Sequence, residues 1–319
     1  MFRSCSAALA LLGLVAGTAH AAYPDRPIKL VVGYTPGSAA DVAGRIAAEE
    51  LGNILGQRLV IENKPGAASN TAAESVSRAE ADGYTLFLSN IANTINSSLK
   101  QGASIDLVRD LKPIALLCTL PTILVVSKTL EAKSVPELIA FAKERPDPLF
   151  FGSSGHGTAP HLSGELFASM AGIKLVHVPF SGSTQPVQEM IGGRIQLMFA
   201  PASTVLGQIE GGTIRALAWS TPKRGPTLPD LPTVSEQGLA GFDTSIWFGL
   251  SGPPQLADAI RDQIASAVGR AQKSDAMLKS FRAQGIEPLP GGPAEFTAHI
   301  AADSAKWADV VTKAGLVKP

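Results

Sequence analysis

Apolar residues recur along the chain in one repeating arrangement. A short β-branched or aliphatic run is followed by a loop of small polar residues and then by a helical pattern. Strands that alternate with helices in this way predict an α/β fold with mainly parallel sheets flanked by helices. The runs that we interpret as strands are residues 28–32, 84–88, 149–151, 175–178 and 195–199.

Helical patterns fill much of the remaining chain. Residues 42–51, 256–268 and 296–314 each carry an apolar stripe at helical spacing, which predicts a helix with one buried face. Glycine is the residue that most readily adopts the left-handed conformation at a helix end. Helix ends are therefore predicted at Gly172, Gly192–Gly193 and Gly211–Gly212.

Two strand-like stretches, residues 122–127 and 244–250, lack the small polar loop after them. We interpret them as two crossing strands that form a hinge between two lobes. Lobe 1 would comprise residues 22–120 and 244–319, and lobe 2 would comprise residues 121–243. A chain of this length can bury a core in each lobe.

The N-terminus has the pattern of a signal peptide. Arg3 precedes an apolar run at residues 7–17, and Ala19-His20-Ala21 has the small-x-small form of a cleavage site. The run is shorter than the roughly 20 residues that a membrane-spanning helix needs. We therefore predict a signal peptide at residues 1–21, cleavage after Ala21, export and no membrane insertion.

Charge and cysteine content narrow the possible partners. Without Arg3, 26 basic residues stand against 27 acidic ones, with no long run of either sign. We therefore expect no nucleic-acid partner. Cys118 is the one cysteine outside the predicted signal peptide, so no internal disulfide is expected. We also expect a monomer.

The strand exits carry the candidate binding chemistry. Ligands of parallel sheets bind at the carboxyl ends of the strands, and here those exits are rich in Gly, Ser, Thr and Asn. The start of a helix holds anions through unpaired N–H groups, without Arg or Lys. Residues 35–41 and 153–158 could each supply the about four donors that suit a carboxylate. Ordinary strand–helix turns share this composition, so for any one loop that alternative stays open.

Catalytic and metal-binding interpretations are less favoured. The G-x-S-x-G elbow of serine hydrolases is absent, because Gly152-Ser153-Ser154-Gly155 has a different spacing. His177 alternates with valines in a strand, which favours a structural role. His156 and His161 are five residues apart, and on a helix they would point roughly 140° from each other. We therefore predict no metal site, and no phosphate-loop or other cofactor motif is present.

Two side chains keep two interpretations each. His161 would either lie in a first helical turn near Glu165 or face the cleft as a donor. Asp41 would either interact favourably with the dipole of its helix or orient a polar group of the ligand or a bridging water.

Short motifs occur in a fixed order along the chain. They are Tyr23-Pro24-x-x-Pro27-Ile28-x-Leu30-Val31-Val32 with Pro36-Gly37, Glu62-Asn63-Lys64-Pro65-Gly66-Ala67, Ala81-Asp82-Gly83-Tyr84-Thr85-Leu86, His161-Leu162-x-Gly164-Glu165-Leu166-Phe167, His177-Val178-Pro179-Phe180-x-Gly182 and Trp247-Phe248-Gly249-Leu250. Each motif is weak alone, but the ordered set is specific and extends from about Tyr23 to Leu316. The set resembles the periplasmic substrate-binding receptors of tripartite tricarboxylate transporters, often called Bug receptors.

The resemblance implies a two-lobed type II periplasmic binding protein, not an enzyme, that closes on a small carboxylate. It also implies membrane permease subunits of a tripartite transporter as partners. The resemblance and the strand-exit loops together give the candidate ligand-binding residues, with no catalytic residue and no metal ligand among them. They are Tyr34, Gly37, Ser38, Ala39, Ala40, Asp41, Ser89, Asn90, Ser153, Ser154, Gly155, Thr158, His161, Phe180, Ser181, Gly182, Ser183 and Ala200.

Three departures from the family pattern bear on the ligand. Residues 38–40 offer fewer side-chain donors than the usual first loop. Ala200 stands where many relatives have Asp, which disfavours a ligand with an amino group. Ser181 replaces a common Lys, which makes the pocket more neutral. We therefore expect an aromatic or hydroxylated carboxylate that stacks on Tyr34 or Phe180.

Two other functions remain as alternatives. A secreted serine hydrolase would need Ser154 and His161 in contact. A receptor that feeds a sensor kinase would have the same binding site as one that feeds a permease.

Overall fold

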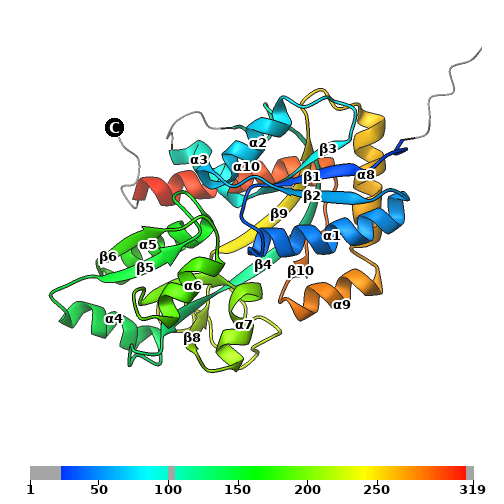
Figure 1. The fold of residues 1–319 in the computed structure, drawn as a ribbon. Coiled ribbons are helices and arrows are strands. Elements are labelled where there is room, and N and C mark those ends of the chain that lie inside the picture. The colour runs from blue at the N-terminus through cyan, green and yellow to red at the C-terminus, as the bar shows by residue number, and fades with distance from the viewer. Residues whose placement is uncertain (1–22, 100–104, 314–319) are drawn as a thin grey trace, which may run out of the picture.

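The computed structural model describes residues 23–99 and 105–313, which form two lobes joined by extended strands (Figure 1). The predicted signal peptide lies outside the described residues. One lobe holds β1 (Ile28–Val32), α1 (Ala39–Leu55), β2 (Leu59–Asn63), η1 (Ala67–Ser69), α2 (Asn70–Ser77), β3 (Thr85–Asn90), α3 (Ile91–Leu99), β9 (Ser245–Gly252), α8 (Asp258–Ala271), α9 (Asp275–Ala283), β10 (Glu287–Pro288) and α10 (Pro293–Lys313).

The second lobe is coloured green to yellow-green in Figure 1. It is built from α4 (Val135–Glu144), β5 (Leu149–Ser153), α5 (Ala159–Ala171), β6 (Leu175–Pro179), α6 (Thr184–Ile191), β7 (Leu197–Pro201), α7 (Ala202–Glu210) and β8 (Ile214–Trp219). Among the described residues, no helix combines the length and the apolar character needed to cross a membrane.

The sheets are mixed. β1 pairs in parallel with β2 and β3, and β5 pairs in parallel with β6 and β7, as the strand–helix alternation predicts. The strands next to them, β9 and β4 (Lys112–Ser127), run antiparallel to their neighbours. The antiparallel pairs arise because these strands take the chain from one lobe to the other and back.

A single strand, β4, belongs to both lobes. It pairs with β9 as far as Pro121, and from Thr122 onward it pairs with β7 and β8. The chain returns at Thr244, whose N–H donates to the Ser220 carbonyl at 2.8 Å. The Thr122 and Ser220 hydroxyls are hydrogen-bonded to each other, and Ser220 Oγ donates to the Thr244 carbonyl at 2.5 Å. These contacts support the predicted lobe boundaries, 120/121 and 243/244, which remain a proposal.

The hydrophobic cores follow the lobes. The largest core collects apolar side chains from β1, β3, β9 and the helices around them, and it includes Cys118, which is fully buried in β4. Two further cores cover the two faces of the lobe 2 sheet. Ala159 and Leu162, at the start of α5, belong to the core of the opposite lobe. The lobes are therefore packed against each other in a closed arrangement.

Local signals account for most helix ends. Ser38 and Ser134 cap α1 and α4, each accepting a first-turn N–H at 3.3 Å, as N-cap serines do. Gly172 ends α5 in the left-handed conformation, as predicted. In the two glycine pairs, the second residue, Gly193 or Gly212, takes that conformation.

One segment adopts an unfavourable backbone conformation. Ala67, Ala68 and Ser69 have φ values of 45°, 48° and 77°, in the left-handed region that costs a residue with a Cβ about 1–2 kcal/mol. The segment packs against β1: a Cβ on Gly33 would lie 1.9 Å from Ser69 Oγ. Gly33 is thus required by a close contact at the exit of the first strand.

We predict that Ala68→Gly stabilises the protein by about 0.5–1 kcal/mol, because relief of the left-handed conformation exceeds the added chain entropy of glycine. Ala140→Gly, at an exposed site inside α4, is the matched control and should lower the free energy of unfolding by about 1 kcal/mol. Urea unfolding measures both. A loss of stability in Ala68→Gly equal to that in the control would contradict the assignment of strain.

Candidate ligand-binding cavity

The starts of several helices converge where the lobes meet. Helices α1, α3, α5, α6 and α7 each follow a strand whose carboxyl end faces the other lobe. Asn90, which ends β3, accepts the Ala92 N–H at 3.0 Å and so caps α3. Thr158 precedes α5, and its Oγ1 donates to the Gly155 carbonyl at 2.7 Å. These short, polar exits let the helix starts approach one another closely.

A small cavity of about 30 Å³, partly open to solvent, lies between these helix starts. None of the described residues that line it carries a charged side chain. Eight of them were predicted as ligand-binding residues. The lining consists of Tyr34, Ser38, Ala39, Ala40, Asn90, Ile91, Ser154, Thr158, Ala159, Pro160, Ser183, Pro201, Ile246 and Phe248.

The lining combines two kinds of surface. First-turn N–H groups have no carbonyl acceptor within their own helix, and α1 and α5 bring such groups from opposite lobes at Ala40 and Ala159. Ile91, Ile246 and Phe248 supply an apolar surface. An anion with an apolar body can satisfy both surfaces, because the helix starts attract the negative charge.

Direct contacts between the lobes close one side of the cavity. The Ala39 N–H donates to Ser183 Oγ at 3.4 Å, and Thr184 Oγ1 donates to the Gly37 carbonyl at 3.2 Å. Gly182 faces the first loop so closely that an added Cβ would lie 2.4 Å from Thr35 Oγ1. A side chain at residue 182 would therefore require Thr35 to move.

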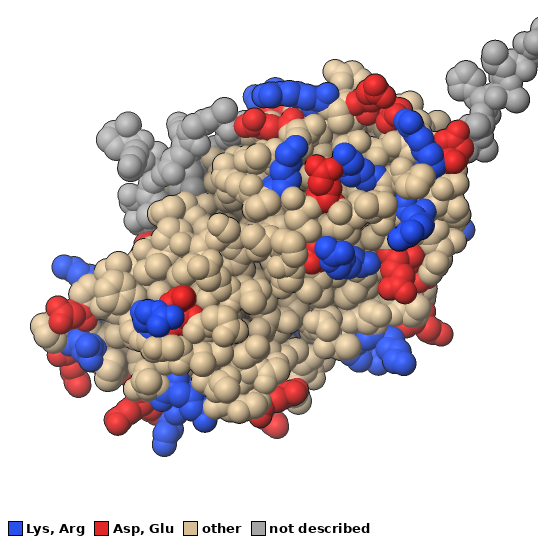
Figure 2. Space-filling model, in the orientation of Figure 1, with Lys and Arg blue, Asp and Glu red and all other residues tan. Residues whose placement is uncertain are grey.

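A second hollow adjoins the cavity and shares Tyr34 and Ser154 with it. It contains three further predicted residues, Gly155, Phe180 and Ser181, and the lobe 1 segment 66–70 lies opposite them. On the face that Figure 2 shows, acidic and basic side chains are scattered over the surface, and the band between the lobes is largely uncharged.

Seven predicted residues line neither space: Gly37, Asp41, Ser89, Ser153, His161, Gly182 and Ala200. Ser89 Oγ is turned toward another strand and donates to Ser251 Oγ at 2.6 Å. Ala200 is fully buried in a lobe 2 core. Conversely, the cavity lining includes Ile246 and Phe248, which are not among the predicted residues although their alternation within a crossing strand indicates a shared face.

Asp41 holds the first loop in place. Its carboxylate accepts the Gly37 N–H, the Asn63 amide and two N–H groups of Arg45, all at 2.9 Å. Burial raises the pKa of Asp41, but the hydrogen bonds from Arg45, Gly37 and Asn63 lower it by more than burial raises it. The pKa therefore lies below its ordinary value. These bonds hold the Asp41 carboxylate within its own lobe, outside the lining of the cavity. Arg45 also neutralises the carboxylate beside a helix start.

Tyr34 is buried and lines the cavity. Its hydroxyl donates to Asn90 Oδ1 at 3.3 Å. Burial raises the pKa of Tyr34, so the phenol is uncharged and opposes no anion.

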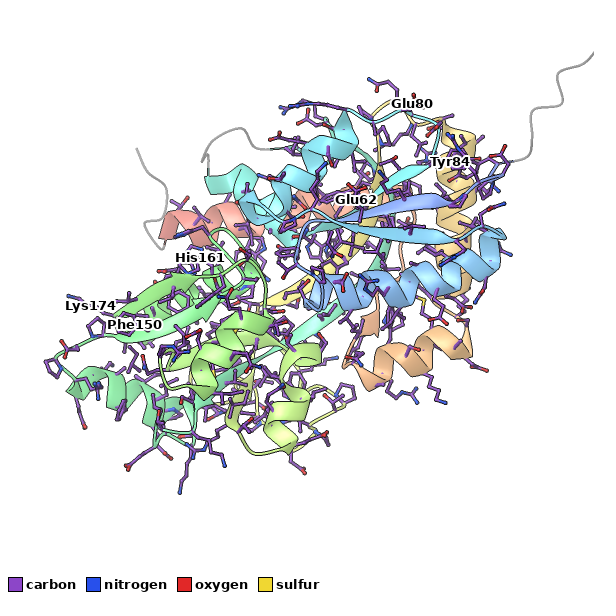
Figure 3. The ribbon with its side chains drawn as sticks, in the orientation of Figure 1. Glu62, Glu80, Tyr84, Phe150, His161 and Lys174 are labelled. Carbon is purple, nitrogen blue, oxygen red and sulfur yellow. The ribbon has the colours of Figure 1, made fainter. Side chains whose placement is uncertain are left out.

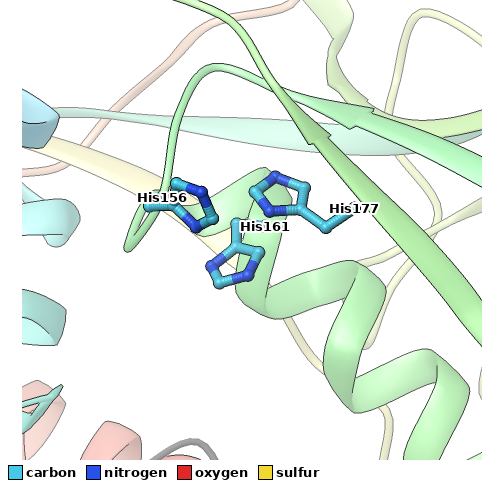
Figure 4. A group of neighbouring side chains, drawn as sticks. All are labelled: His156, His161 and His177. Carbon is cyan, nitrogen blue, oxygen red and sulfur yellow. The ribbon is translucent and has the colours of Figure 1, made fainter.

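The predicted separation of His156 and His161 by about 140° around one helix is wrong. Helix α5 begins at Ala159, and His156 lies in the preceding loop. The chain turns there, so that the two rings come within 5.5 Å, and His177 joins them from β6 (Figure 4).

His161 lies in the first turn of α5, on the side of lobe 2 toward the other lobe (Figure 3). Its Nε2 is 3.7 Å from Glu165 Oε1, which is the first of its two predicted placements. Its Nδ1 accepts the Gly157 N–H at 3.1 Å. Burial, with the charge of His156, lowers the pKa of His161 to about 4, and burial, with His161 and His156, lowers the pKa of His177 to about 3. Both rings are uncharged at neutral pH.

A serine hydrolase arrangement does not form from these groups. Ser154 lines the cavity, but the ring nitrogens of His161 face Gly157 and Glu165. Ser153 contacts His177 Nε2 at 2.5 Å, yet Ser153 is fully buried and bonded to the backbone of Gly155. Within the described chain, no carboxylate orients His177, as a triad requires.

The fold and the cavity define a two-lobed solute-binding receptor. Residues 43–316 match the family described as "Tripartite tricarboxylate transporter family receptor". The protein BugT of Bordetella pertussis (strain Tohama I) is 31% identical over 309 residues, which cover 96% of this chain and 95% of BugT. The chain therefore belongs to this receptor family, whose members are periplasmic and are not enzymes.

Solved structures agree with this assignment. Rpa4515 of R. palustris with adipate has a TM-score of 0.89 and 34% sequence identity, covering 92% of this chain and 98% of that one. MatC from Rhodopseudomonas palustris with bound malate has a TM-score of 0.86 and 26% identity, covering 91% and 100%. The two-lobed periplasmic binding protein fold that the sequence predicts is confirmed.

We predict that Asp41 makes stability depend on pH. A carboxylate with a lowered pKa in the folded state stabilises above its unfolded value, and this contribution is lost as the pH falls through the folded value. Asp41→Asn should cost about 1.5 kcal/mol near neutral pH, at the low end for a charged hydrogen bond because Arg45 is half exposed.

The measurement is urea unfolding from neutral pH down to about pH 3, with exposed Asp147→Asn as the matched control. The curves of the wild type and Asp41→Asn should converge as the pH falls. A constant difference across this range would show that the Asp41 charge is not the source.

Proposed function

We propose that the protein binds a small carboxylate in the cavity between the lobes and delivers it to a membrane permease of the tripartite tricarboxylate type. The observation that carries this proposal is the convergence of uncharged, N–H-rich helix starts from both lobes on one shared space. We further propose that the receptor acts in the periplasm after cleavage behind Ala21. Its action as a monomer remains a prediction.

The relatives support a carboxylate as the ligand class. Rpa4515 is described with adipate and MatC with malate, and both ligands are small dicarboxylates. In this chain a carboxylate would contact the starts of α1 and α5, near Ser38, Ala40 and Thr158. Each hydrogen bond to a charged group there would contribute about 1.5–3 kcal/mol.

Within this class we propose a ligand with an aromatic or hydroxylated body. Tyr34 and Phe248 offer aromatic surfaces inside the cavity, while Phe180 lies in the adjoining hollow. The residue at position 200 is alanine, buried in a core, and thus provides no acid for a ligand amine. Ser154, Ser183 and Asn90 provide side-chain partners for a hydroxyl.

Binding would be coupled to closure of the lobes. A ligand with equal affinity for the open and closed forms shifts neither. A carboxylate that bridges α1 and α5 favours the closed form, because each lobe alone presents only part of its donors. The bending would fall where both crossings meet, at Thr122, Ser220 and Thr244. A permease or a sensor kinase could use the closed form as its signal.

The test uses a panel of adipate, malate, benzoate, aspartate and glutamate, measured by thermal shift and calorimetry. We predict that Thr158→Asp weakens binding of the strongest carboxylate at least about tenfold, through repulsion of like charges. Ser134→Asp, which also places an aspartate at a helix cap, but on α4 at the outer end of lobe 2, should leave affinity unchanged.

Unchanged affinity in Thr158→Asp would show that the start of α5 does not contact the carboxylate. Strongest stabilisation by aspartate or glutamate would overturn the proposed ligand preference, and no binding by any carboxylate would overturn the ligand class.

A steric change tests closure separately. In Gly182→Ala the new methyl group would meet Thr35 Oγ1 across the lobe boundary. We predict weaker ligand binding and a smaller ligand-induced decrease in the radius of gyration, measured by small-angle X-ray scattering. Thr35→Ala in the same protein should restore both. Equal scattering and affinity in the wild type and Gly182→Ala would show that these loops need not meet.

A further inference from the structure

Three histidines gather in lobe 2, outside the lining of the cavity. His156 lies in the loop after β5, His161 in the first turn of α5, and His177 in β6. One ring nitrogen from each lies within 4.8 Å of the other two. Figure 4 shows the three rings turned toward one another. Three segments of the chain thus bring imidazoles to a single point.

His177 has a buried nitrogen without a partner. Its Nε2 lies 2.5 Å from Ser153 Oγ, while its Nδ1 is buried and has no hydrogen bond. An unsatisfied buried polar atom costs about 1–3 kcal/mol, and such atoms are uncommon in folded proteins. When the Nε2–H group donates to Ser153, Nδ1 carries a lone pair, and no donor faces it.

His161 is oriented in a similar way. Its Nε2 faces the Glu165 carboxylate at 3.7 Å, and its Nδ1 carries the lone pair that accepts the Gly157 N–H. A metal-bound imidazole usually donates its far N–H to a carboxylate or another oxygen, which fixes the ring. Glu165 faces the Nε2 atom of His161 in this way, and Ser153 faces the Nε2 atom of His177.

His156 is the adjustable member. It is exposed and lies between Gly155 and Gly157, whose φ values are 128° and 72°. Nitrogens around a tetrahedral Zn²⁺ lie roughly 3.4 Å apart, given Zn–N distances of about 2.0–2.1 Å. The present spacing is wider, so the loop must move by about 1 Å and release the Gly157 N–H from His161. The two glycines permit this movement.

We propose that His156, His161 and His177 form a binding site for a divalent transition-metal ion such as Zn²⁺. Uncharged imidazoles suit Zn²⁺, Ni²⁺ and Cu²⁺, whereas Mg²⁺ and Ca²⁺ prefer oxygen ligands. Ring stacking explains the distance of 4.0 Å between the ring centres of His161 and His177. It does not explain the unpaired Nδ1 of His177, which a metal ion would satisfy.

The experiment uses untagged protein stripped with EDTA and titrated with Zn²⁺ by calorimetry at neutral pH. We expect one ion per chain, and Co²⁺ should give the visible absorption of a tetrahedral nitrogen site. His156→Ala removes an exposed side chain, so the fold should persist. Loss of a group that only orients a metal ligand weakens metal binding about 10- to 100-fold. Loss of the ligand His156 should weaken Zn²⁺ binding by at least as much.

His299→Gln is the matched control, since His299 lies against Trp247 in the other lobe, and it should retain full affinity. Ser153→Ala should bind Zn²⁺ about tenfold more weakly, because His177 loses its oriented tautomer. No saturable binding at micromolar Zn²⁺, equal affinity in His156→Ala, or loss of binding in His299→Gln would each overturn the proposal. The carboxylate panel, run on metal-free protein, tests the receptor function independently.

Discussion

The N–H groups at the start of a helix have no acceptor within that helix, and this fold turns the starts of α1, α3, α5, α6 and α7 toward one space. The side-chain oxygens of Ser38, Asn90 and Ser183 accept some of these groups. The rest of the site follows from this constraint. Most residues at the strand exits are small, Tyr34 and Phe180 being exceptions, and this lets the helix starts approach closely. The lining carries no cation, and the backbone supplies partial positive charge instead.

A site built from partial charges depends on position more than a site built from arginine would. No single N–H group binds an anion strongly in water, so donors from both lobes must act together. The closed contact of Gly182 with Thr35 and the buried hydroxyls at the crossings serve this requirement. Asp41 would oppose an anion at the start of α1, but Arg45 neutralises it while the same carboxylate holds the loop.

Much of this could be read from the sequence, and the failures have physical causes. The buried run 28–32 predicts β1 to the residue, and small residues after each strand predict where the cavity lies. The half-buried β2 has no such run, since Glu62 and Asn63 end it. Spacing along one helix could not bring His156 to His161 and His177, because the loop geometry and the pairing of β5 with β6 create that contact. Ala200 lies on the side of β7 that packs in a lobe 2 core, and tertiary packing decides which face of the strand that is.

Cys118 lies in β4 with no exposed surface, and burial raises the pKa of its thiol. Thiolate is the reactive species in disulfide exchange, so in the folded state the Cys118 sulfur is protected from oxidants and from other thiols. Two copies can be cross-linked through this sulfur only after the core of lobe 1 opens. The rate at which a thiol reagent labels Cys118 therefore reports how often that core opens. It does not report movement of one lobe against the other.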